Sequence, residues 1–309
     1  MSCQRVCTQL VRVKQVLIVG AGYVGLPLAF ALGRLGHKVT ALRRSTSEDA
    51  AMLAAGITPL HADVTRAESL SGLSNQFDWV VNCTATGGGN EVDYRSLYLN
   101  GTRNLLEWLS SGFRENAAAR FVYTSSTGVY AQNDGSVVDE LSPTEPASET
   151  GRVLLETERV LREAANASFP AVLLRAAGIY GPDRGYLLKQ FLAGEARIEG
   201  EGGRQLNMIH RDDLVQAIIA ALERGQPGEI YNATDDEPVS QTIFYTWIAE
   251  KLGRPLPPGA MASPDVARRR GLTSKRVSNR KLRAELRCEL KYPTFREGYG
   301  AELTRLGLI

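Results

Sequence analysis

A glycine-rich motif placed directly after an apolar segment is the feature of this sequence that most constrains its fold. Residues 16–19 form a β-branched, apolar run and lead into Gly20-Ala21-Gly22-Tyr23-Val24-Gly25, which has the spacing G-x-G-x-x-G. A second apolar stretch, 26–35, follows at once, so the predicted order is strand, tight turn and helix. In such a unit the first glycine permits the turn, the second lets a pyrophosphate approach the backbone, and the third lets the helix pack against the strand. We therefore predict a dinucleotide site that includes Gly20, Gly22, Tyr23, Val24 and Gly25.

The end of the second predicted strand, 38–42, indicates which dinucleotide is bound. NAD sites commonly place an acidic residue about 20 residues beyond the glycines, where it accepts a hydrogen bond from the ribose 2′-hydroxyl. This chain has Arg43-Arg44-Ser45 there, and the first acid is Glu48. A guanidinium can pair with a 2′-phosphate, which a carboxylate would repel. We predict that Arg43 and Arg44 favour NADP over NAD, with NAD still possible; the alternative is that one arginine is merely solvated.

Composition narrows the class of protein. The 309 residues are 43% apolar, which is enough for one large α/β domain or a domain with a lobe. The net charge of +2 gives no general attraction to nucleic acid or membranes, so we expect a small-molecule substrate as the partner. The four cysteines have the spacing of neither a metal site nor a disulfide framework, and they favour a cytoplasmic location. No apolar run approaches the ~18 residues of a membrane span.

Strand and helix patterns alternate through the first half of the chain. Apolar runs predict further strands at 57–61, 79–83, 120–124 and 171–174, and helices at 91–110 and 150–167. In the second of these helices, we expect Glu156, Glu158, Arg159 and Arg162 on solvated faces. The alternation predicts an α/β fold of the Rossmann type, a doubly wound parallel sheet with helices on both faces.

Ligands of such sheets bind beyond the carboxyl ends of the strands. This places 84–86, 125–127 and 176–178 on one rim, with Ser125 and Ala177 among the expected cofactor contacts. Beyond residue 181 the pattern is less regular, with helices predicted at 186–193, 212–223 and 242–252 and a strand at 229–232. We predict an N-terminal tail at 1–15, an NAD(P)-binding domain at 16–177, and a small C-terminal substrate lobe at 178–309, of which about 205–235 returns to the sheet.

Several further motifs occur in a characteristic order. They are Asp63-Val64, Asn100-Gly101-Thr102, T-S-S-T-G-V-Y at 124–130, R-A-A-G-I-Y-G-P at 175–182, N-M-I-H-R-D-D-L at 207–214 and K-R-V-S-N-R-K-L at 275–282. With these motifs the chain resembles the extended short-chain dehydrogenase/reductases, the NAD-dependent epimerase/dehydratase superfamily, over nearly its whole length. Its G-x-G-x-x-G spacing, in place of the commoner G-x-x-G-x-x-G, resembles the atypical, YeeZ-type bacterial subgroup.

The resemblance implies roles for individual positions. Asp63 and Val64 would contact the adenine, and Thr84, Ala85 and Thr86 would pass beneath the ribose. Asn100 would anchor the middle of the sheet. Ser126 would occupy the catalytic serine position, four residues before Tyr130. His210 and Asp212 would lie where a lobe helix starts, with Asp212 expected to cap that helix.

The resemblance fails at the position where the family carries its chemistry. The family uses a Tyr-x-x-x-Lys pair in which the lysine lowers the pKa of the tyrosine. Thr150 stands in place of the tyrosine here and Leu154 in place of the lysine, and no tyrosine in the chain has a lysine four residues later. A threonine hydroxyl without an adjacent charge is too weak an acid to substitute. Any proton donor must therefore be a different group. Tyr130 is the candidate donor, and Ser126 would orient the substrate carbonyl. Water, His210 or a group on the substrate itself are the alternative donors.

Three functions are compatible with this sequence. The first is an NADPH-dependent reductase of a small carbonyl-like substrate with a non-standard proton donor, since the cofactor carries the hydride chemistry. The second is an NADP(H)-binding redox sensor or scaffold without turnover. The third is a nucleotide-sugar epimerase or dehydratase, which the missing Tyr-Lys pair disfavours. The sequence does not identify the substrate.

The remaining candidates concern substrate contacts and partners. We predict substrate contacts from Thr127, Arg152, Arg184 and His210. A basic run between Arg268 and Arg287 is interpreted as a solvated face, although in the family this region borders the substrate lobe and would attract an anionic substrate. The apolar residues of the helices predicted at 91–110 and 150–167 allow a homodimer or a monomer.

Overall fold

A parallel sheet of seven strands forms the centre of the computed structural model, which describes residues 12–110, 119–165, 169–260 and 273–309. Its strands are β1 (Gln15–Val19), β2 (Lys38–Arg43), β3 (Thr58–His61), β4 (Trp79–Asn82), β5 (Arg120–Ser126), β7 (Ala171–Ala176) and β12 (Ile230–Ala233). They lie in the order β12-β7-β5-β4-β1-β2-β3, and every neighbouring pair is parallel. The order reverses between β1 and β4, which is where such sheets bind ligands. The predicted doubly wound Rossmann fold is confirmed.

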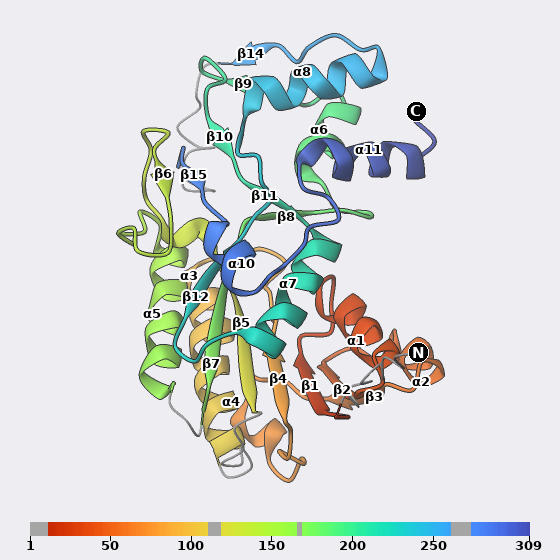
Figure 1. The fold of residues 1–309 in the computed structure, drawn as a ribbon, viewed down its shortest axis with the longest axis vertical. Helices are drawn as coiled ribbons and strands as arrows, with labels where there is room; N and C mark the ends of the chain where they lie inside the picture. The colour runs from red at the N-terminus through yellow and green to blue at the C-terminus, as the bar shows by residue number, and fades with distance from the viewer. Residues whose placement is uncertain (1–11, 111–118, 166–168, 261–272) are drawn as a thin grey trace, which may run out of the picture.

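Helices cover both faces of the sheet (Figure 1). Residues of α1 (Gly25–Arg34), α2 (Asp49–Ala54), α7 (Arg211–Arg224) and α10 (Arg280–Glu285) pack in one core, and residues of α4 (Gly101–Ser110) and α5 (Glu149–Ala164) pack in the other. The strand β1 serves both cores: Val16 and Ile18 join the first, and Leu17 and Val19 the second. A strand buried on both faces explains why this segment reads as an uninterrupted apolar run.

The helix predicted at 91–110 is α-helical at both ends and π-helical in the middle. It consists of α3 (Glu91–Tyr94), a π-helical segment η2 (Arg95–Asn100) and α4. The residues just beyond Ser110, where we expected the helix to end, lie outside the described part. Asn100 is exposed, so its predicted role as an anchor inside the sheet is wrong. Thr102 is buried instead, and its hydroxyl accepts a hydrogen bond from Asn82 at 3.4 Å.

A smaller lobe lies beyond the carboxyl ends of the strands (Figure 1). Its core packs residues of α6 (Tyr186–Leu192), α8 (Gln241–Leu252) and α11 (Phe295–Arg305) together. Short paired strands frame it: β8 (Gly178–Tyr180) with β11 (Met208–His210), β9 (Ile198–Glu199) with β14 (Gly259–Ala260), and β10 (Gln205–Leu206) with β13 (Val239–Ser240). A further pair, β6 (Val137–Val138) with β15 (Arg276–Val277), brings the C-terminal segment beside the loop that follows β5. Two single 3₁₀ turns complete the described elements, η1 (Ala67–Leu70) and η3 (Thr127–Val129).

Three expectations need correction or restriction. Glu158 is fully buried rather than solvated, although its neighbours Glu156 and Arg159 are not. The apolar residues that suggested a dimer largely cover the sheet of their own chain, since Tyr98, Leu105 and Leu161 are buried in its core. Residues 1–11 of the predicted tail and residues 268–270 of the basic run lie outside the described part.

Candidate functional site

A cleft of about 690 Å³ lies at the carboxyl edge of the sheet, where β1, β2, β4, β5 and β7 end. We call it the cofactor cleft. Every predicted cofactor-binding residue lines it except Gly25, which lies behind its wall. The lining residues from that prediction are Gly20, Gly22, Tyr23, Val24, Arg43, Arg44, Asp63, Val64, Thr84, Ala85, Thr86, Ser125 and Ala177.

The three glycines of the motif differ in how much space the protein leaves for a side chain. Gly20 has φ +88°, and a Cβ there would lie 2.7 Å from the backbone nitrogen of Thr84. A Cβ on Gly25 would lie 2.3 Å from the carbonyl oxygen of Gly20, so only glycine allows the helix to pack this closely. At Gly22, by contrast, a Cβ would meet no atom of the described residues within 4 Å. The fold does not need this glycine, but the open space beside it is where a pyrophosphate would approach.

The end of β2 provides the positive charge predicted for the 2′-phosphate. Arg43 donates to the Ser47 hydroxyl at 3.2 Å through Nη2, and its buried Nη1 has no hydrogen-bond partner among the described residues. Arg44 is 75% exposed, and its Nη1 lies 3.9 Å from the Asp63 carboxylate. Burial opposes ionisation of Asp63, but hydrogen bonds from Thr65 and the charge of Arg44 hold its pKa below the usual value. Asp63 is therefore an ionised acceptor at the cleft wall.

The loop after β4 is held by the strand beneath it. The side-chain oxygen of Asn82 accepts hydrogen bonds from the backbone N–H of Thr84 at 3.2 Å and from its hydroxyl at 2.9 Å. The N–H of Thr86 donates to the hydroxyl of Tyr98 at 3.2 Å. The buried Thr86 hydroxyl lies beside that of Tyr98, and both residues line the cleft.

Two neighbouring serines at the end of β5 have different surroundings. The Ser125 hydroxyl donates to the Glu158 carboxylate at 2.5 Å, beneath the cleft. The Ser126 oxygen accepts a hydrogen bond from the N–H of Gly128 at 3.0 Å and lines the cleft. Because the Ser126 hydroxyl proton has no acceptor among the described residues, it can be donated to a substrate oxygen.

Tyr130, the predicted proton donor, does not reach the cleft. It is fully buried and belongs neither to the lining of the cofactor cleft nor to that of the neighbouring pocket described below. Its hydroxyl accepts from Nη1 of Arg175 at 2.9 Å and donates to the side-chain oxygen of Asn232 at 2.9 Å. Burial is the main reason that its pKa is raised, so the phenol is a poorer acid than free tyrosine.

The same hydrogen-bond network contains a buried ion pair between Arg175 and Glu158, which the sequence pattern does not predict. The guanidinium of Arg175 pairs with the carboxylate of Glu158, with the shortest contact at 2.6 Å, and both side chains are at most 3% exposed. Ser125 and Tyr130 each bond one partner of this pair. The network joins α5, β5, β7 and β12 beneath the loop that carries Ser126.

Thr150 and Leu154, which stand at the positions of the family's Tyr-Lys pair, both lie in α5. Leu154 lines the cofactor cleft and is nearly buried, so an apolar side chain occupies the place of the lysine. The hydroxyl of Thr150 lies 3.3 Å from that of Ser148, at the start of α5. Thr150 lines neither cavity, whereas Ser126 lines the cofactor cleft.

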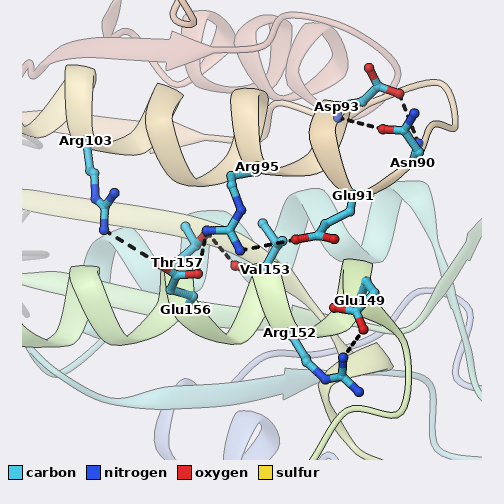
Figure 2. Close-up of polar contacts among 10 residues, drawn as sticks. All are labelled: Asn90, Glu91, Asp93, Arg95, Arg103, Glu149, Arg152, Val153, Glu156 and Thr157. Atoms are coloured by element: carbon cyan, nitrogen blue, oxygen red, sulfur yellow. Dashed lines mark hydrogen bonds and ion pairs between the residues drawn. The ribbon is translucent and has the colours of Figure 1, made fainter.

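The predicted substrate contacts are dispersed. Arg184 lines the cofactor cleft, where its guanidinium lies 5.0 Å from the centre of the Tyr23 ring. Arg152 is on the exposed side of α5 and pairs with Glu149 (Figure 2), and it lines neither cavity. Thr127 lines a second pocket, described below. Only Thr127 is thus placed for a substrate that is separate from the cofactor.

His210 has a structural position at the start of α7. Its Nδ1 accepts the N–H of Asp212 at 3.1 Å, so His210 and not Asp212 caps the helix. Its ring packs between Tyr180 and Tyr292, with ring centres 5.4 and 3.9 Å away. Burial is the main cause that lowers the pKa of His210 to about 4, so the ring is neutral at neutral pH. It lines neither cavity.

A second cavity of about 540 Å³ lies between the sheet and the lobe. We call it the lobe pocket. Thr127 and Gly128 line it, while the adjacent Ser126 lines the cofactor cleft, and Gly178 and Ile179 line both. Lys275 is also in its wall and is buried. The basic run around Lys275 predicts a solvated side chain, and this prediction is wrong. The position of Lys275, two residues before the apolar Val277 of β15, is the signal in the sequence that indicates burial.

Comparisons with known proteins agree with this geometry. The model of the NAD dependent epimerase/dehydratase family matches residues 16–234. Protein YeeZ of Escherichia coli K12 is 31% identical, over 91% of this chain and 97% of that protein. A 3-diazoavenalumate denitrifying reductase of Streptomyces is 29% identical, over 93% of this chain and all of the relative. A solved structure of a conserved protein of unknown function from Silicibacter pomeroyi has a TM-score of 0.75 and 30% identity, and the match covers 94% and 99% of the two chains.

Proposed function

Because this chain belongs to the NAD dependent epimerase/dehydratase family, we propose that it is an NADP(H)-dependent reductase that acts on a carbonyl group of a small molecule. The observation that carries this proposal is the cofactor cleft itself. It includes the open space beside Gly22 and the Ser126 hydroxyl, whose proton has no acceptor among the described residues. The likeness to a relative described as a reductase, over nearly the full length of both chains, supports the same reaction class.

The residues of the cleft fit a dinucleotide along its length. The N–H groups at the start of α1 would bind the pyrophosphate, aided by the positive end of the helix dipole. Asp63 offers an ionised acceptor for the adenine amino group, and Thr86 in the cleft wall would contact the ribose region. The exposed Arg184 lies over Tyr23 of the glycine loop and adds a positive charge beside the pyrophosphate. When bound, the nicotinamide supplies the hydride.

The protein's part in the chemistry is orientation and charge stabilisation. The Ser126 hydroxyl, held by the Gly128 N–H, would donate a hydrogen bond to the substrate carbonyl oxygen as negative charge develops on it. Thr127 and Gly128 would form the adjoining wall of the substrate site. Since the two side chains expected to donate the proton, Tyr130 and His210, line neither cavity, we propose that water supplies the final proton. This distinguishes the proposed mechanism from one based on a tyrosine acid.

A specific observation favours a second candidate, a cofactor-binding redox sensor without turnover. Leu154 places an apolar side chain at the cleft position where a lysine would contact the ribose and activate an acid. A protein that only senses NADP(H) would need the rest of the cleft and not that charge. The same replacement argues against a nucleotide-sugar epimerase or dehydratase, because abstraction of a hydride from an alcohol needs a base.

Turnover separates the two candidates. We expect NADPH to bind the purified protein and to be oxidised, as followed at 340 nm, with at least one member of a panel of aldehydes, ketones, imines and enones. Ser126→Ala should lower kcat/KM by about tenfold or more through the lost hydrogen bond, with NADPH affinity unchanged. Ser71→Ala, an exposed serine outside the cleft, is the matched control. Binding without oxidation across the panel would favour the sensor, and absence of binding would overturn both proposals.

The cofactor preference is tested separately. Replacing both Arg43 and Arg44 by alanine should weaken NADPH binding by about tenfold or more, because a charged hydrogen bond to the 2′-phosphate contributes roughly 1.5–3 kcal/mol. NADH affinity should change less than NADPH affinity. Arg34→Ala, which removes an exposed charge near the end of α1 and outside the cleft, serves as the control in fluorescence titrations. Tighter binding of NADH than of NADPH to the unaltered protein would contradict the assignment.

A further inference from the structure

The ammonium group of Lys275 lies in the wall of the lobe pocket in an unusual electrostatic setting. The residue is only 4% exposed. Its Nζ donates to the carbonyl oxygen of Tyr130 at 2.9 Å and to the hydroxyl of Thr273 at 2.7 Å. An ammonium carries three donors, so one N–H remains without an acceptor in the described chain. The side chain is therefore anchored by two neutral oxygens and retains a donor for a ligand.

No carboxylate compensates this charge among the residues that the structure describes. None of the described acidic groups forms an ion pair with Lys275, whereas Lys281, a few residues along the same segment, pairs with Glu229. The charged group that acts on Lys275 is instead Arg204, which is also positive. Burial first, and Arg204 second, lower the pKa of Lys275 to about 8. A buried charge without a counter-ion is costly, and an anion in the pocket would remove that cost.

The net charge of the side chains described in the pocket wall suits a ligand with one negative charge. Among the residues that the structure describes, the charged side chains in its lining are Arg197, Arg204, Lys275, Glu195 and Glu199, and these sum to one positive charge in excess. Arg204 already pairs with Glu199 at 3.2 Å. The rest of the wall includes Tyr186, Leu206 and Met208, which suit an apolar or aromatic body. A doubly charged phosphate would face the two glutamates, so the balance favours a monoanion.

We propose that Lys275 binds a carboxylate of the substrate, so that the substrate class is a carbonyl compound bearing a carboxylate on an apolar body. This inference rests on the proposed function, because the ligand of the lobe pocket is a substrate only if the protein is a reductase. The adjacent Thr127 and Gly128 line the same pocket, and the preceding Ser126 faces the cofactor cleft. A carboxylate held at Lys275 therefore directs the other end of the molecule toward Ser126. Lys275 acts as a binding residue and specificity determinant.

The binding step can be measured without cofactor and without turnover. The full-length protein, labelled with ¹³C at the lysine Cε, is titrated by NMR with benzoate, phenyl phosphate or the neutral benzamide. The Lys275 resonance is identified as the one lost in Lys275→Met, and also in Lys275→Arg should the first variant fail to fold. We expect benzoate to shift this resonance and raise the Lys275 pKa, and the Lys275→Met change to weaken benzoate binding by about tenfold or more. Lys251→Met, an exposed lysine of α8, should bind benzoate like the unaltered protein.

Each other outcome overturns the proposal. Equal affinity for benzamide and benzoate would show that the pocket recognises the ring and not the charge. Tighter binding of phenyl phosphate would assign the site to phosphate. A Lys275 resonance that benzoate does not move, or equal losses in the Lys275 and Lys251 variants, would show that Lys275 is not the ligand. Because neither NADPH nor turnover enters this experiment, failure of the reductase proposal would appear only in the oxidation assay.

Discussion

Replacing Glu158 by alanine is expected to lower the free energy of unfolding by about 3–5 kcal/mol, because the change leaves the buried Arg175 guanidinium without its carboxylate. Three hydrogen bonds from Arg175 and one from Ser125 end on Glu158, and neither member of the pair is more than 3% exposed. In this interior an uncompensated charge cannot recover its hydration. Urea denaturation, with the slope checked for two-state behaviour, measures the loss.

Glu156 provides a matched control on the same helix. It lies two residues earlier and pairs with Arg95 at 2.9 Å and with Arg103 at 3.7 Å, across the surface between α5 and the η2–α4 segment (Figure 2). Its side chain is 39% exposed, so Glu156→Ala should cost at most about 1 kcal/mol. The double change Glu158→Leu with Arg175→Met should be more stable than Glu158→Ala, since no buried charge is left alone. Equal losses for Glu156→Ala and Glu158→Ala would contradict the interpretation of this network.

The sequence predicted the sheet well because the signals that define it are local. The apolar run before Gly20 and the constraint on Gly25 belong to one strand–turn–helix unit, and each glycine's role follows from contacts within or beside that unit. The strands β1, β4 and β7 are buried on both faces, which explains why each one contains a run of apolar residues. The rim residues then follow from the rule that ligands bind beyond the carboxyl ends of parallel strands.

Polar side chains could not be placed in the same way. Glu158 and Glu156 are indistinguishable in a helical pattern, yet a two-residue step on a helix turns one inward, where Arg175 from a strand 17 residues later meets it. Lys275 belongs to a basic run whose other members suggest a solvated face, and only the pairing of β15 with β6 buries it beside Tyr130. Such partners are distant along the chain, so a pattern of residue types in one segment does not reveal them.

The largest expected effect on ligand binding is at Gly22. A Cβ at this position meets no atom of the described residues within 4 Å, so Gly22→Val should fold with little change in thermal stability. The added side chain would occupy the space beside the glycine loop in which the pyrophosphate must approach the backbone. Loss of two charged hydrogen bonds, each roughly 1.5–3 kcal/mol, corresponds to a decrease of about 100-fold or more in NADPH affinity.

Two other glycines make this prediction specific. Gly33→Ala in α1, the helix that follows the glycine loop, places its Cβ in ordinary contact, 3.8 Å from Ile57, and away from the cleft, so both stability and NADPH affinity should be kept. Gly25→Ala would force a Cβ to within 2.3 Å of the Gly20 carbonyl oxygen, so it should destabilise the protein itself. Calorimetric titration with NADPH, beside thermal unfolding of the free proteins, separates the two effects. Since the fold tolerates a side chain at position 22, an NADPH affinity unchanged in Gly22→Val would mean that the pyrophosphate does not bind at this loop.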